Sequence, residues 1–358
     1  MQIFLHNLEK ITIFATKIAM KERINWIDWA KFMAITLVVL GHIPLKSGHP
    51  LHIYIYYFHM PLFMFISGYL TKRRPTISEN LKKDWISIIR PYLLYNLAFY
   101  PYWVVRKYIE SNADLSIFEY VVKPVLGVCF FQIDTPISSN VSGPIWFLVA
   151  LVMAHVIIDI GNSIRFRKLF WIAVAVAGLS FYVANEKYLY TSNITIIGLA
   201  KCFPFYLTGY LLYGKIKIET TNPYGIWFTT LATGILSIEL TAISLQTTDF
   251  LLHMLLIFVI ILLAITFFIG VSLSLNNLKW KVITNISIGT LVIFGLHWML
   301  IGTLNFALQK ILGIPEMTYS TCQAILLTFV IEATLYPLIK LLPPIWIGKR
   351  KDILEQVK

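Results

Sequence analysis

The sequence predicts an all-α polytopic membrane protein with about ten transmembrane helices, and its composition is the first observation that does so. Of the 358 residues, 58% are hydrophobic and 13% are charged, and the mean hydropathy is +0.72. Soluble domains carry about one quarter charged residues. Apolar segments long enough to cross about 30 Å of hydrocarbon also recur along the chain. Basic residues gather in the short segments between them, as topology signals do.

We expect ten membrane spans within one membrane domain, residues 23–342. The spans are roughly 29–46, 52–70, 91–105, 144–164, 169–184, 194–213, 224–244, 250–270, 286–306 and 318–340. Residues 1–22 have apolar positions interrupted by Glu9, Lys10 and Lys17, which favours a leader or an interfacial amphipathic helix over a secretory signal. Residues 343–358 are expected to form a basic cytoplasmic tail.

The distribution of Lys and Arg sets the expected orientation. With the N-terminus inside, 23 of the 30 basic residues fall in inner segments, six fall in outer segments and Lys201 lies within a span. This bias predicts that both termini are cytoplasmic and that the protein spans a bacterial inner or plasma membrane. We therefore attribute the net charge of +12 to basic residues that lie at the membrane surface. The lipid bilayer is the expected partner, and no nucleic-acid partner is expected.

Two histidines and a lysine within the first two spans stand out as candidates for chemistry. Lys31 and His42 are eleven residues apart, which places them on one helix face and roughly 16 Å apart. His59 is expected at a depth similar to that of His42 in the next span. Pro61 would free the carbonyl of Tyr57, a defect that is tolerated at membrane depth where it lines a cavity. Ionisable groups inside a membrane indicate a functional site by default.

These residues also carry a resemblance to a known family. Lys31 with ten residues before His42, followed by Phe58–Phe63 and Ser67–Tyr69, resembles the opening signature of the acyltransferase-3 family of integral membrane O-acyltransferases. Weaker matches follow in the family's order at Arg90–Tyr92, Trp146–Leu148, Pro204–Leu207, Gly209–Tyr210, Gly289 and His297. The resemblance covers roughly residues 23–342 and is to the stand-alone type, without an added hydrolase-like domain outside the membrane.

The resemblance implies transfer of an acyl group, usually acetyl from cytoplasmic acetyl-CoA, to a hydroxyl of a glycan or lipid-linked sugar at the outer face. Acetyl-CoA is then the donor substrate, and no metal is expected. Succinyl transfer is an alternative donor chemistry, and a transporter or flippase of a glycan or lipid-linked intermediate is the rival class. Many family members have an Arg-x-x-Arg pair where this chain reads Ser87-Ile88-Ile89-Arg90.

Each candidate residue has a proposed role and a plainer alternative. His42 is the expected general base for a sugar hydroxyl, or a transient acyl carrier, rather than a core histidine. His59 is either catalytic support or a helix-bridging group, and Asp28 is expected to orient or neutralise Lys31, one turn away. Lys31, Arg73, Arg74, Lys82, Lys83 and Arg90 are expected to bind the coenzyme A phosphates, although Lys31 could instead be an interfacial anchor and Arg73 and Arg74 topology signals.

The expected acceptor-binding residues are Trp146, Lys201, Glu239 and His297. A tryptophan suits stacking on a sugar ring, although tryptophans are also common at membrane interfaces. Lys201 could meet an anionic sugar, but internal pairing with a carboxylate is favoured; Glu332 is a further intramembrane charge. His297 could instead tie helices together, and His155 and His253 are interpreted as structural. The three cysteines are scattered and indicate neither a disulfide framework nor a metal site.

Overall fold

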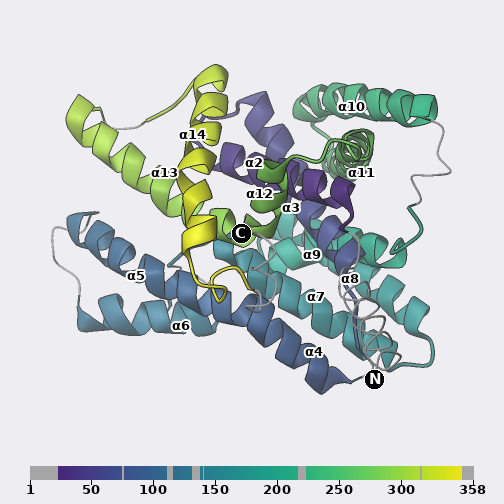
Figure 1. The fold of residues 1–358 in the computed structure, drawn as a ribbon, viewed down its shortest axis with the longest axis horizontal. Coiled ribbons are helices and arrows are strands. Elements are labelled where there is room, and N and C mark those ends of the chain that lie inside the picture. The colour runs from purple at the N-terminus through teal and green to yellow at the C-terminus, as the bar shows by residue number, and fades with distance from the viewer. Residues whose placement is uncertain are drawn as a thin grey trace, which may run out of the picture.

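The computed structural model describes residues 23–74, 76–110, 116–130, 138–139, 141–216, 223–314 and 317–348. In this part of the chain the structure is helical and contains no strand, which confirms the predicted all-α membrane fold (Figure 1). The expected leader at residues 1–22, the chain termini and most of the expected cytoplasmic tail lie outside the described residues.

Within the described ranges, eight helices are long and apolar enough to cross a membrane. They are α3 (Pro50–Leu70), α7 (Trp146–Asn162, with the preceding turn from Gly143), α8 (Arg167–Tyr188), α9 (Ile194–Leu211), α10 (Pro223–Gln246), α11 (Phe250–Ser274), α13 (Thr290–Leu312) and α14 (Thr321–Leu341). The two remaining expected spans coincide with α2 (Asn25–His42) and α5 (Arg90–Glu110), which are long but less apolar.

Short helices complete the described structure. They are α4 (Ile77–Asp84), α6 (Lys123–Cys129) and α12 (Lys281–Ile288), with π-helical turns at Trp85–Ile89 and Phe118–Val122 and a 3-10 turn at Gly143–Ile145. The expected span 286–306 is interrupted, because α12 ends at Ile288 and α13 begins at Thr290. A Cβ on the intervening Gly289 would lie 2.4 Å from Ile339, so the chain turns there against α14.

Helices α2 and α3 form the centre of the bundle, with α9, α11, α12, α13 and α14 packed around them (Figure 1). Glycines allow α3 and α9 to touch backbone to backbone: a Cβ on Gly68 would lie 2.0 Å from the Tyr206 carbonyl oxygen, and one on Gly209 would lie 2.1 Å from that of Phe65. Because apolar side chains gain little by leaving lipid for another helix, close contact of small residues is a main source of helix association in membranes. The centre of the bundle is therefore tightly held.

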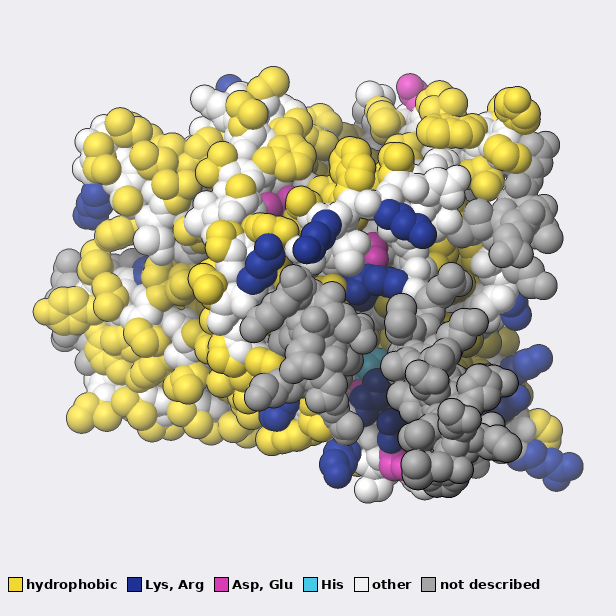
Figure 2. Space-filling view, viewed as in Figure 1, with side chains coloured by type: hydrophobic (Ala, Val, Ile, Leu, Met, Phe, Trp, Pro, Cys, Tyr) yellow, Lys and Arg dark blue, Asp and Glu magenta, His cyan; other side chains and the backbone are white. Residues whose placement is uncertain are grey.

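The surface agrees with a membrane location. On the face drawn in Figure 2, Lys and Arg side chains gather around the centre and the right-hand side, and the left half is mostly hydrophobic. Helices α8 and α10 carry large exposed apolar side chains along their outer faces, among them Leu169, Val176, Phe228 and Ile235. Such surfaces are stable in contact with lipid tails rather than with water.

Candidate active site

Three histidines from three helices meet near the end of α2. His42 is the last residue of α2, His59 lies on α3 and His297 on α13. The ring centroid of His42 is 4.9 Å from that of His297 and 6.3 Å from that of His59. The sequence placed His42 and His59 at similar depth, and the structure brings them together with His297. In the described part of the chain no three His, Cys, Asp or Glu side chains are arranged to hold a metal ion.

Hydrogen bonds define the tautomer of all three rings. The Nδ1 of each lies within 2.7–3.0 Å of a backbone carbonyl one helical turn earlier, which belongs to Val38, Ile55 and Ile293 respectively. Because a carbonyl oxygen only accepts, Nδ1 carries the hydrogen and Nε2 carries the lone pair in each neutral imidazole. A lone pair on Nε2 is what a general base requires.

His297 supports His42 from behind. It is fully buried, and its Nε2 lies 3.3 Å from Nδ1 of His42, so it accepts a second, longer hydrogen bond from the N–H that His42 donates to Val38. The Trp298 indole packs edge to face against the His42 ring, with the two ring centroids 5.3 Å apart. No hydrogen bond to His42 Nε2 occurs among the described residues, which leaves that lone pair available to a substrate.

A cavity of about 320 Å³ opens beside this cluster. It brings together four residues that the sequence predicted for the site, namely His42, His59, Trp146 and Lys201. Its wall also contains residues that sequence reasoning missed, among them Tyr56, Cys202 and Trp298. Two of these had a signal in the sequence, since Trp298 follows His297 directly and Tyr56 precedes His59 by three residues, on the same face of α3.

Lys201 is the one cation in the described wall of this cavity. Its Nζ donates to the Tyr56 carbonyl at 3.3 Å and lies 5.8 Å from the centre of the Tyr182 ring. The carboxylate partner favoured from the sequence is not present among the described residues. Glu332 instead accepts a hydrogen bond from Thr36 at 2.8 Å.

The structure does not place Glu239 in the cavity, contrary to the expectation from the sequence. The sequence suggested an acceptor-binding carboxylate, but the side chain is exposed on the outer face of α10 and does not line the cavity with His42. Hydropathy shows that a residue lies in a span, but not which side of the helix it occupies. His155 bonds to Asp84 and His253 bonds to Ser244, and neither histidine lines the cavity with His42.

Trp146 is placed by a glycine on the neighbouring helix. A Cβ on Gly198 of α9 would lie 2.1 Å from the Trp146 indole ring, so the ring occupies space that only a glycine leaves. We predict that Gly198→Ala pushes the indole out of place and, for the acyl transfer that the sequence resemblance implies, lowers the rate by about tenfold, the factor that about 1.4 kcal/mol produces. The measurement is the transfer rate of the purified variant.

Gly178→Ala on α8 is the matched control for this change. Its added Cβ would meet its nearest neighbour, the Ala200 carbonyl oxygen, at an ordinary 3.4 Å, and it should leave the rate within twofold, or about 0.4 kcal/mol, of the unmodified protein. Equal rates for the Gly198→Ala and Gly178→Ala variants would contradict the role given to Trp146.

Asp28 interacts with Lys31 through its charge, but its hydrogen bonds go to other residues. Its carboxylate accepts two hydrogen bonds from Arg23, at 2.5 and 2.8 Å, and one from Ser287 at 2.7 Å. No hydrogen bond or ion pair joins Asp28 to Lys31 among the described residues. Asp28 therefore fastens the start of α2 to α12, and its effect on Lys31 is limited to its charge. Lys31 itself is partly buried, about three turns from His42 on the same helix.

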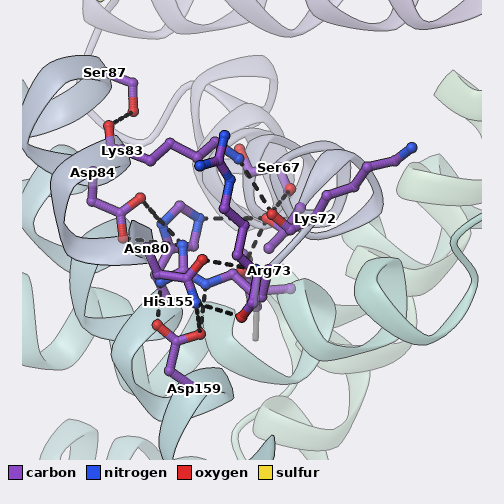
Figure 3. Close-up of polar contacts among 12 residues, drawn as sticks. Ser67, Lys72, Arg73, Asn80, Lys83, Asp84, Ser87, His155 and Asp159 are labelled. Atoms are coloured by element: carbon purple, nitrogen blue, oxygen red, sulfur yellow. Dashed lines mark hydrogen bonds and ion pairs between the residues drawn. The ribbon is translucent and has the colours of Figure 1, made fainter. Parts of the chain in front are cut away.

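A second polar cluster lies toward the other end of the bundle. Arg73, in the segment after α3, is paired through both edges of its guanidinium with Asp84 at the end of α4 and Asp159 on α7. His155 and Asn80 complete the cluster through hydrogen bonds of 2.9 Å to Asp84 and 3.0 Å to Asp159 (Figure 3). His155 and Asp159 follow Trp146 by nine and thirteen residues on α7, so they lie roughly 14–20 Å along the helix from Trp146, which lines the cavity with His42.

The ion pairs within this cluster explain the position of Arg73 without any contact to coenzyme A. The Arg73 side chain is 2% exposed, whereas that of Arg74 is 58% exposed and only loosely paired with Glu79 at 3.8 Å. Lys82 and Lys83 are also exposed, and a buried Arg90 Nε has no hydrogen-bond partner in the described structure. Of the cations expected to bind coenzyme A, Arg74, Lys82 and Lys83 are therefore accessible, and Arg73 holds α4 against α7.

The charges in the cluster stabilise one another. Burial alone would raise the pKa of Asp84, but the hydrogen bond from His155 and the Arg73 charge outweigh burial and hold that pKa below its usual range. Burial likewise opposes the charge of Arg73, and its pKa is nevertheless raised by Asp159 and Asp84. Because the Asp84 pKa is lowered in the folded protein, its contribution to stability is complete at neutral pH and is lost as the pH falls through that lowered pKa.

These features define the class of protein as a helical membrane bundle with a histidine-lined cavity. A family model described as an acyltransferase domain matches residues 24–336. The chain therefore belongs to the acyltransferase-3 family, as the sequence predicted.

The chain is also similar to a curated relative over about half of its length. The nodulation protein NolL of Mesorhizobium japonicum is 28% identical over 196 residues, which are 51% of this chain and 46% of that protein. The matched region thus spans less than half of the relative's length. No solved structure matches the chain.

Proposed function

We propose that the protein moves an acetyl group from cytoplasmic acetyl-CoA to a hydroxyl of a cell-surface or exported polysaccharide. The observation that carries this proposal is His42, whose Nε2 has no hydrogen bond among the described residues and which lines a cavity with His59, Trp146 and Lys201. A base of this kind beside an aromatic ring and a cation suits a sugar hydroxyl as the nucleophile. We place the cavity in the outer half of the cell membrane and the Arg73 cluster at the cytoplasmic end, as the distribution of basic residues predicts.

During the transfer, His42 accepts one proton and later gives it up. Nε2 of His42 takes the proton of the acceptor hydroxyl as its oxygen attacks the thioester carbonyl carbon. The resulting tetrahedral intermediate collapses by breaking the C–S bond, the acetyl ester remains on the sugar, and the imidazolium returns the proton to the coenzyme A thiolate. Formation of an acetyl-imidazole on Nε2 followed by attack of the hydroxyl uses the same atom. In both routes the imidazole ends neutral.

The donor is held by cations at the opposite end. Arg74, Lys82 and Lys83 are exposed near the Arg73 cluster, and their charges suit the phosphates of coenzyme A. Lys31 lies on α2 between that end and His42, where its charge suits the phosphates of coenzyme A. Arg73 contributes by holding α4 in place rather than by contact with the donor.

The role of His297 can be tested with two substitutions, one that removes the hydrogen-bond acceptor and one that keeps it. His297→Leu removes the acceptor behind His42 Nδ1 and should lower kcat by up to about tenfold, since a hydrogen bond of this kind contributes about 0.5–1.5 kcal/mol. His297→Gln can offer its Oε1 in the same place and should recover most of the rate. Initial rates at saturating donor test this. Equal losses in both variants would show that His297 acts only through packing.

The host's surface glycan provides the test of function. Proton NMR of that glycan, from cells with and without the gene, should show base-labile acetyl signals only when the gene is present. Succinyl signals in their place would keep the reaction class and change the donor. Identical spectra would exclude a surface-glycan acceptor.

A further inference from the structure

A second cavity, of about 260 Å³, lies on the other side of His42. His42 and Trp298 line both cavities and, among the described residues, are the only ones that the two cavities share. The first cavity is otherwise built on α3, α7 and α9, whereas the second lies between α5 and α13. The imidazole and the indole therefore form a partition with a chamber on each side.

The second cavity follows one face of α13. Its residues Trp298, Ile301, Gly302, Asn305, Phe306 and Gln309 recur every three or four positions. This stripe extends from the His42 cluster for about 16 Å along the helix. The glycine in it is needed for the fit between helices, since a Cβ on Gly302 would lie 2.3 Å from the Tyr102 hydroxyl of α5. The groove is thus a shaped extension of the active site along the outer part of α13.

The lining of this groove is polar at the end away from His42. Asn305 Oδ1 accepts a hydrogen bond from the Tyr319 hydroxyl at 2.7 Å, which orients the amide and leaves its NH₂ group to donate. Gln309, one turn further along, has no hydrogen bond in the described structure, and Arg106 of α5 faces the same cavity. Two amides and a guanidinium around an aromatic wall are groups that bind the hydroxyls and ring faces of a sugar.

We propose that the groove is a subsite for the sugar unit next to the one that is acetylated, so that the acceptor lies across the partition with its reacting hydroxyl at His42. This inference rests on the proposed function and specifies its acceptor further. A site with a chamber on each side of the base binds a unit inside a glycan chain more tightly than a single sugar, because the second chamber adds contacts that a single sugar does not make.

The length of the acceptor glycan fragment tests whether the groove is a subsite. The host's surface glycan is de-O-acetylated with mild base, cleaved by partial acid hydrolysis and separated by size, and kcat/KM for acetyl transfer is measured on each fraction. We expect kcat/KM for the longer fragments to exceed that for the shortest accepted fragment by about tenfold or more, and Gln309→Trp, which fills the groove, to reduce this ratio to near one. Arg106→Gln should lower the ratio in the same direction.

Thr303→Trp is the matched control, because Thr303 is an exposed residue on the same helix and outside the groove. It should leave the ratio unchanged. A ratio that does not depend on fragment length in the unmodified protein, or that survives Gln309→Trp, would overturn the subsite while leaving the proposed reaction intact. If the unmodified protein transfers acetyl to no fragment, the proposed function fails, and the subsite fails with it.

Discussion

Replacing His42 with glutamine should lower acetyl transfer by about 10²–10⁴-fold, the usual contribution of a general base. Glutamine keeps a hydrogen-bonding side chain of similar length, but it has no basic nitrogen to take the proton of the acceptor hydroxyl. The fold should survive, because His42 is the last residue of α2 and its ring hydrogen bonds to the carbonyl of Val38 within the same helix. Transfer from radiolabelled acetyl-CoA by the purified protein gives the rate.

His253→Gln is the control for that substitution. His253 is also a histidine within a membrane-spanning helix, but it bonds to Ser244 and does not line either cavity beside His42. Its variant should transfer acetyl at close to the unmodified rate. A His42→Gln variant that keeps more than about one tenth of the rate would contradict the assignment of the base, since a loss of tenfold is only about 1.4 kcal/mol.

Replacing Arg73 with methionine should destabilise the protein by about 3–5 kcal/mol, as is typical when one partner of a buried ion pair is removed. The change leaves Asp84 and Asp159, both buried, without their shared cation. Helix α4 would then lose its main polar attachment to α7. Thermal unfolding of the purified protein in detergent measures the effect.

Arg74→Met provides an adjacent comparison. The Arg74 side chain is 58% exposed, and exposed ion pairs contribute about 0–1 kcal/mol, so this variant should unfold near the temperature of the unmodified protein. If Arg74 contacts coenzyme A, its variant should instead show a raised KM for acetyl-CoA. Equal unfolding temperatures for the two arginine variants would contradict the structural role given to Arg73.

The sequence predicted the helices and the similar depth of two histidines for a simple physical reason. Hydropathy depends on composition, and residues three turns apart must share a helix face, so Lys31 and His42 could be placed along α2 without knowledge of the other helices. The depth of His59 followed from the chain direction of the next span. The break at Gly289 could not be seen in the same way, because it depends on contact with Ile339 of another helix.

What the sequence could not predict was the partner of each charge. Arg73 has the same local context as Arg74, yet one is buried between two carboxylates and the other faces outward. Asp28 is paired with Arg23 rather than Lys31, and Glu239 faces outward on α10. These outcomes depend on helix rotation and on contacts between segments distant in sequence.

In the proposed reaction an acetyl group moves from a donor on one side of the membrane to a sugar hydroxyl on the other. The direct measurement uses the full chain in vesicles, with acetyl-labelled acetyl-CoA sealed inside and the de-O-acetylated surface glycan outside. The predicted result is label on the external glycan as a base-labile ester, free coenzyme A inside, and neither with His42→Gln. Label that stays in acetyl-CoA, or equal labelling by the unmodified protein and the His42→Gln variant, would contradict the claim.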